Sequence, residues 1–220
     1  PVDGTIEVFG GVVDAYTMTE AVKDGITVNL VYDGRAAKVM LNQDKVRQIE
    51  EYYAQCELEG ANEHQVEESQ KAVAKMEVII GDPDRLRAVA EDFIKHYETR
   101  VAEGATVAGK AMFVCSNRNI AYDFYKIVKE LRPKWTEKKI CDDGVVLSEK
   151  DKKELKPMEK IKLVMTRNKD DEKDLFDMLG TKEDRKEFDR QFKNPKSNFK
   201  IAIVVDMWLT GFDVPELDTI

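Results

Sequence analysis

The chain of 220 residues has few of the residues that build disulfide frameworks or zinc sites. Its three cysteines, Cys56, Cys115 and Cys141, lie far apart, and it has only two histidines. This argues against a disulfide-stapled fold and any metal site, and it favours a reducing, cytoplasmic setting. No apolar run exceeds the five residues of 201–205, whereas a membrane-spanning helix needs about 20. No secretory signal opens the chain, so we expect no membrane association.

The sequence also lacks a phosphate-binding loop of the form GxxxxGK[ST] and an acidic box of the DEAD kind. The sequence therefore contains no loop of the kind that binds the β- and γ-phosphates of a nucleotide. The chain has no initiator methionine, and it stops at Ile220 in what reads as an unfinished element. We expect it to be a piece of a longer protein, inactive as an enzyme by itself.

Acidic side chains outnumber basic ones by 43 to 35, which gives a net charge of -8. The excess lies in the first half, because residues 1–110 carry 12 basic and 21 acidic side chains, whereas residues 111–220 carry 23 and 22. The second half could present a local basic face. Its densest basic stretch, residues 126–139, fits either a solvated helix face or phosphate contacts.

The first half predicts a connector followed by helices. Residues 1–41 alternate short apolar runs with turn signals, and we expect a short helical turn at 19–23 and a strand at 26–32. Residues 42–106 show apolar stripes at helical spacing and form a predicted helical insertion. Its last helix is predicted to begin after Asp82, with Pro83 in the first turn, and to stop near Gly104.

The second half, residues 107–220, predicts an α/β layer fold. Three segments, at 111–115, 161–166 and 201–205, read as strands, and helical patterns follow the first two. The first is a continuous apolar run, as expected of a strand buried on both faces, and the third is fully apolar. Strands that alternate with helices indicate parallel pairing. The predicted fold is therefore a parallel sheet flanked by helices, preceded by the helical insertion.

Polar and basic residues follow each predicted strand, where open parallel sheets bind their ligands. Ser116 and Asn117 are candidate caps of the next helix, whose free N–H groups favour anions, and Arg118 adds a charged fork. Thr166 and Arg167 follow the second strand. The third strand leads into residues 206–215, with sequence DMWLTGFDVP. Together they predict a shared phosphate-facing edge.

The segment IVVDMWLTGFDVPELDT, residues 203–219, closely resembles motif V of superfamily-two helicases. The sequence of this motif is most similar to that of the motor and restriction (R, or HsdR) subunit of type I restriction enzymes. AMFVCSNRNIAYDFY, residues 111–125, resembles motif IV of the same family. Residues 5–35 resemble the stretch that links its two RecA-like lobes, and the helical part from 43 to 104 resembles it less.

The resemblance implies a second RecA-like motor lobe, truncated at its C-terminal end. In such motors ATP and Mg²⁺ lie between two lobes and duplex DNA crosses both, so this lobe would help to bind duplex DNA and to close the ATP cleft. The parent would work with modification and specificity subunits. By the same resemblance, nucleotide-facing residues would be Gly211 and Asp213, and DNA-facing residues would be Ser116, Asn117, Arg118, Asp206 and Thr210, with Thr166 and Arg167 beside them.

Two other hypotheses fit the residues. The chain could belong to another superfamily-two helicase or translocase, although the match of DMWLTGFDVP disfavours it. It could also be a non-enzymatic interaction module whose acidic helical half docks a partner protein. The acidic-x-Lys pattern Glu137-Lys138-Lys139, with Asp123 upstream, superficially fits a nuclease. It lies in a charged linker and not on a strand, which argues against that interpretation.

Overall fold

The computed structural model describes residues 15–29, 31–34 and 80–220. The chain divides between residues 36 and 37 into two units, which we describe separately. The predicted helical stripes at 46–56 and 66–79 lie outside the described residues. The boundaries predicted at 41 and 106 stay predictions. No helix among the described residues is long and apolar enough to cross a membrane.

The described part of the first unit includes a short helix, α2 (Met18–Lys23), which confirms the predicted helical turn. Thr17 and Glu20 form a capping box, in which each side chain accepts a hydrogen bond from the backbone N–H of the other. The predicted strand at 26–32 is wrong for the residues described there, which have no strand structure. Ile26, Val28 and Val31 are each more than 70% exposed. These β-branched side chains therefore lack the burial that makes such residues favour a strand.

Helix α5 (Pro83–Ala102), in the second unit, begins where the sequence predicts. The Asp82 carboxylate accepts from the backbone N–H of Arg85, and Pro83 occupies the first turn. The helix ends at Ala102, and Gly104 follows with a φ of +65°, a conformation that glycine adopts without strain. Its buried face joins the same hydrophobic core as the sheet.

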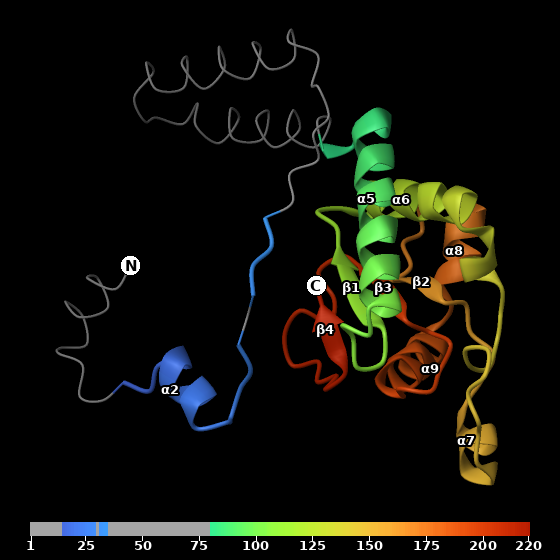
Figure 1. The fold of residues 1–220 in the computed structure, drawn as a ribbon. Helices are drawn as coiled ribbons and strands as arrows, with labels where there is room; N and C mark the ends of the chain where they lie inside the picture. Colours follow the sequence, from blue (N-terminus) through green and yellow to red (C-terminus); the bar gives the residue numbers. More distant parts are fainter. Residues whose placement is uncertain (1–14, 30, 35–79) are drawn as a thin grey trace, which may run out of the picture. The chain divides into compact units, whose positions relative to one another are not determined.

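Four parallel strands form the sheet, in the order β2-β3-β1-β4 (Figure 1). They are β1 (Lys110–Val114), β2 (Ile161–Val164), β3 (Ile201–Val204) and β4 (Leu217–Thr219). The first three confirm the predicted strands, and the all-parallel sheet with its helices confirms the α/β RecA-like fold. The sequence pattern did not indicate β4, a short strand at the sheet edge.

Helices cover both faces of the sheet (Figure 1). On one face, α5, α6 (Arg118–Leu131) and α8 (Lys173–Leu179) pack with the sheet around Phe124, which is fully buried and stacks on Phe113 at 3.9 Å between ring centroids. On the other face, Phe188 and Phe192 of α9 (Lys182–Lys193) pack against β3. The predicted linker between β1 and β2 contains η1 (Pro133–Thr136) and α7 (Glu149–Glu154).

The residues of β2 and β3 are all buried. The prediction that the first strand is buried on both faces is wrong for the carboxyl end of β1, where Phe113 is half-buried and Val114 is 42% exposed. The reason lies in the sheet. Strand β4 pairs with Lys110 and Ala111 of β1, so no strand within the described residues pairs with the end of β1 on that side.

Candidate nucleic-acid and nucleotide interface

The carboxyl ends of three strands lie side by side in register. Val204 of β3 pairs with Val114 of β1 on one side and with Val164 of β2 on the other. The loops that follow, residues 115–117, 165–172 and 205–215, therefore leave the sheet at one edge, which we name the strand-end edge. The structure thus brings together the segments that hold every candidate site residue, as parallel pairing requires.

The loop after β1 leads into α6 through Asn117. The Asn117 side-chain oxygen accepts from the backbone N–H of Ile120 at 2.9 Å, which makes Asn117 the N-cap. Ser116 is exposed and precedes the cap, so of the two candidate caps only Asn117 has this role. The Ser116 hydroxyl is open to solvent at the edge.

We expect Asn117→Ala to lower the free energy of unfolding by about 1 kcal/mol, because the amide of Ile120 loses its partner at the start of α6. Ser116→Ala is the matched control and should change stability by less than about 0.5 kcal/mol, because its side chain is exposed. Urea unfolding of the two variants measures the difference. Equal losses would contradict the assignment of the cap.

Arg118 ties the first loop to the second. One guanidinium nitrogen donates to the Thr166 carbonyl at 2.6 Å, and the other donates to both carboxylate oxygens of Asp171 at 2.5 and 2.6 Å. The backbone N–H of Asn168 also donates to Asp171, at 2.6 Å. Sequence reasoning missed Asp171, because 53 residues separate it from Arg118. The Asn168–Asp171 turn is a local signal, but it does not identify the partner.

The Arg167 side chain packs against helix α8 and does not extend freely into solvent. The carbon of its guanidinium is 4.3 Å from the centroid of the Phe176 ring, and its Nε is buried without a hydrogen-bond partner. The Thr166 side chain is exposed, while its carbonyl accepts from Arg118. Thr166 is therefore open for contact at the edge, and Arg167 would have to leave its aromatic partner to reach a ligand.

The loop after β3 has a strained backbone held by aromatic packing. Asp206 has a φ of 53° and Trp208 a φ of 62°, which costs about 1–2 kcal/mol for a residue other than glycine. The Trp208 ring stacks on Phe212 at 4.1 Å with an interplanar angle of 8°, and it also stacks on Phe192 of α9 at 5.4 Å. This packing fixes the loop in a shape that isolated residues would not adopt.

The same packing presents Asp213 to solvent. Its neighbours on either side, Phe212 and Val214, face the core around α9, whereas Asp213 itself is exposed. Gly211 has a φ of +68°, and a Cβ there would meet no atom within 4 Å. The backbone at Gly211 is therefore open to close approach from outside the chain. Thr210 beside it is exposed as well.

Cys115 lies directly at the end of β1 but does not offer a reactive thiolate. Burial raises the pKa of its thiol to about 12, so the group stays protonated at neutral pH. Among the described residues, no group of three or more His, Cys, Asp or Glu side chains could hold a metal ion.

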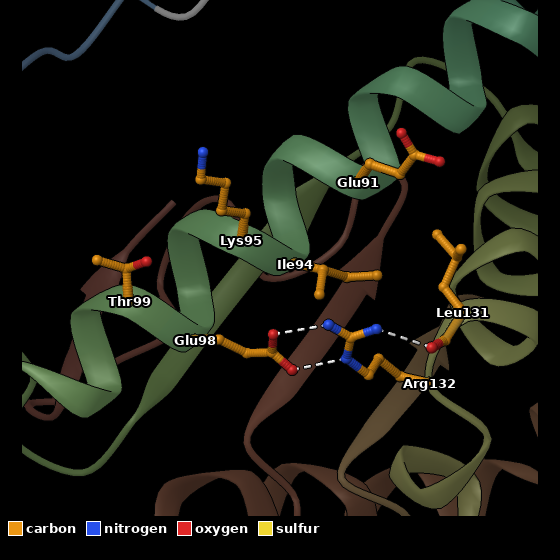
Figure 2. Close-up of a pocket in the computed structure, with 7 residues that line it drawn as sticks. All are labelled: Glu91, Ile94, Lys95, Glu98, Thr99, Leu131 and Arg132. Atoms are coloured by element: carbon orange, nitrogen blue, oxygen red, sulfur yellow. Dashed lines mark hydrogen bonds and ion pairs between the residues drawn. The ribbon is translucent and has the colours of Figure 1, made fainter.

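A separate open hollow of about 290 Å³ lies between α5 and the end of α6 (Figure 2). Glu98 and Arg132 face each other across it, joined by two hydrogen bonds of 2.7 and 2.8 Å. Arg132 lowers the pKa of the Glu98 carboxyl. Because Leu131 and Arg132 lie at the opposite end of α6 from Arg118, this hollow is not part of the strand-end edge.

Comparison with known proteins identifies two regions. Residues 107–220 match the family model described as type I restriction enzyme subunit R domain 3. Residues 2–67 match the model described as SWI2/SNF2 ATPase. No solved structure matches the chain with significance.

Two curated relatives align with almost the whole chain. The type I restriction enzyme HindI endonuclease subunit of Haemophilus influenzae is 33% identical over 215 residues, or 98% of this chain. A protein of Methanocaldococcus jannaschii, provisionally named a type I restriction enzyme MjaIXP endonuclease subunit, is 33% identical over 217 residues, again 98%. The chain spans 18% of the length of each relative. With the subunit R model covering all of residues 107–220, the chain belongs to the family of type I restriction enzyme R subunits.

Proposed function

We propose that residues 107–220 of this chain are the second motor lobe of a protein that moves along duplex DNA at the expense of ATP and cleaves it. The parent would be the endonuclease subunit of a type I restriction–modification system, as its relatives are named. It would act in the cytoplasm with modification and specificity subunits. The observation that carries the proposal is the strand-end edge, where three loops, two of them with motif-like sequences, leave the sheet together.

The DNA side of the proposal rests on exposed polar groups at that edge. Ser116, Thr166 and Thr210 present hydroxyls that can donate to phosphate oxygens, and the N-terminus of α6 adds a favourable dipole. Such contacts do not read base sequence, as a protein moving along DNA requires. Asp206 lies in the same loop as Thr210. Asn117 acts through the helix start that it caps.

The nucleotide side of the proposal rests on Gly211 and Asp213. ATP with Mg²⁺ supplies the free energy of hydrolysis when bound between the two lobes. Gly211 leaves room for a ligand against the backbone, and the exposed Asp213 carboxylate can accept from a ribose hydroxyl or orient a cationic group of the other lobe. The chain has no GxxxxGK[ST] loop, so the phosphates would be held elsewhere in the parent.

The test is ATP hydrolysis by the intact subunit, measured against the concentration of duplex DNA. We expect DNA to stimulate turnover in the wild type. Thr210→Val should raise the DNA concentration for half-maximal stimulation by about three- to tenfold, the loss expected for one hydrogen bond to a charged phosphate, and leave turnover without DNA unchanged. Thr99→Val, at an exposed position on α5, is the matched control and should resemble the wild type. Turnover that ignores DNA in the wild type would refute the proposed function.

A further inference from the structure

At the strand-end edge, the guanidinium of Arg118 already binds an anionic group of the same chain, the Asp171 carboxylate. Asp171 accepts from the guanidinium with both oxygens and from the backbone N–H of Asn168 with one of them. A guanidinium nitrogen with a backbone N–H is the kind of donor set that proteins present to phosphate. The Asp171 carboxylate therefore stands where a phosphate oxygen pair would bind.

We propose that Asp171 is an internal competitor for the DNA phosphate that Arg118 binds, so that duplex DNA engages this edge by displacing the Asp171 carboxylate. The inference rests on the proposed function and adds a residue that sets DNA affinity. It makes Asp171 a positioning residue, since it acts on the ligand through Arg118.

Three features of the pair favour exchange over a purely structural role. The Arg118 side chain keeps 28% of its surface exposed, whereas that of Asp171 keeps 6%, so a phosphate can reach the guanidinium from solvent. Arg118 keeps a second anchor, the Thr166 carbonyl, which would hold the guanidinium in place after Asp171 leaves. The Asp171 carboxylate is also not needed to start α8, whose N-cap is Glu172.

Neutralising Asp171 should therefore strengthen DNA binding. We expect Asp171→Asn in the intact subunit to bind a short duplex without a recognition site roughly five- to tenfold more tightly, since one charge-assisted competitor is removed. The slope of log K against log salt should steepen by up to about 0.9, the value for one further neutralised phosphate. Fluorescence anisotropy of a labelled duplex over a range of salt concentrations measures both quantities.

Control variants separate competition from a general loss of negative charge. Asp170→Asn removes an exposed charge next in sequence and should change affinity by less than about twofold, the effect of an exposed and screened charge. In an Arg118→Gln background, Asp171→Asn should give no gain. Asp171→Ser repeats the test with a hydroxyl that can still accept from the Asn168 amide, in case the Asn variant unfolds.

The outcomes are distinct. Wild-type protein that does not bind duplex DNA would overturn the proposed function and this inference with it. Wild-type protein that binds, with a folded Asp171 variant that binds equally or more weakly, would overturn only the inference. A gain of equal size in Asp170→Asn, or one that persists without Arg118, would also overturn it.

Discussion

Asp213→Ala should lower the DNA-stimulated ATPase of the intact subunit by about 100-fold or more, the loss typical of a single preorganised polar group at a reacting centre. Phe212 and Val214 hold the backbone on both sides of Asp213, and its side chain is exposed. Truncation therefore removes the carboxylate without disturbing the packing of the loop. Steady-state turnover at saturating DNA measures the effect.

Two controls make this result specific. Asp177→Ala removes an exposed carboxylate of α8 that is outside the proposed nucleotide-facing set and should keep turnover within about twofold of the wild type, as expected for a surface substitution. Asp213→Asn keeps the shape and tests the charge alone. Unchanged turnover in Asp213→Ala would remove this residue from the nucleotide side of the proposal, whatever the DNA affinity.

Lys110→Met should stabilise the chain near neutral pH. Lys110 begins β1 at the edge of the sheet opposite the strand-end edge, and its side chain is fully buried. Its ammonium donates to the Phe199 carbonyl at 2.6 Å and lies 5.1 Å from the centroid of the Phe192 ring. Burial, with a smaller contribution from nearby Lys200, lowers the pKa of Lys110 to about 7. Burying a charged ammonium that has no paired carboxylate costs free energy of folding.

The sign of the pH dependence follows from proton binding. Between a folded pKa of about 7 and an unfolded pKa of about 10.5, the unfolded chain binds a proton on Lys110 that the folded chain does not. This group therefore makes the wild type more stable as pH rises through that window, by on the order of 5 kcal/mol in total. Below pH 7 Lys110 is charged in the folded chain, so the full free-energy cost of burying its ammonium is present.

Urea unfolding at several pH values between 6 and 10 tests this account. Near pH 6, Lys110→Met should be more stable than the wild type. Removing the buried charge contributes a few kcal/mol, of which the lost hydrogen bond offsets about 1 kcal/mol. The advantage should shrink as pH rises. Lys162→Met is the matched control, because Lys162 is also buried but its ammonium lies 3.1 Å from the Glu159 carboxylate. A variant of Lys110 that is less stable than the wild type at every pH would contradict the prediction.

Local patterns predicted the parts of the fold that local physics determines. Strand β3 is covered on both faces, so its sequence is a continuous apolar run that can be read directly. The start of α5 was also readable, because Asp82 and Pro83 act within one turn. Strand β4 was not, since its three residues are partly exposed and only pairing with β1 makes them a strand.

The candidate site was predictable in its place but not in its contacts. Parallel pairing required the three strand ends to meet at one edge, and they do. The partner of Arg118 depends on how the loop after β2 folds back, and the left-handed backbone of Trp208 depends on its stack with Phe212. Both are tertiary effects. The roles assigned to Ser116, Thr166, Thr210 and Asp213 stay predictions.

The central claim is that this lobe belongs to an ATP-driven DNA motor, and strand displacement tests it most directly. The intact subunit, assembled with its modification and specificity subunits, is given a duplex that carries a third strand at a set distance from the recognition site. The account predicts ATP-dependent release of the third strand after a lag that grows with that distance. Release without ATP, or no release although DNA stimulates ATP hydrolysis, would contradict it.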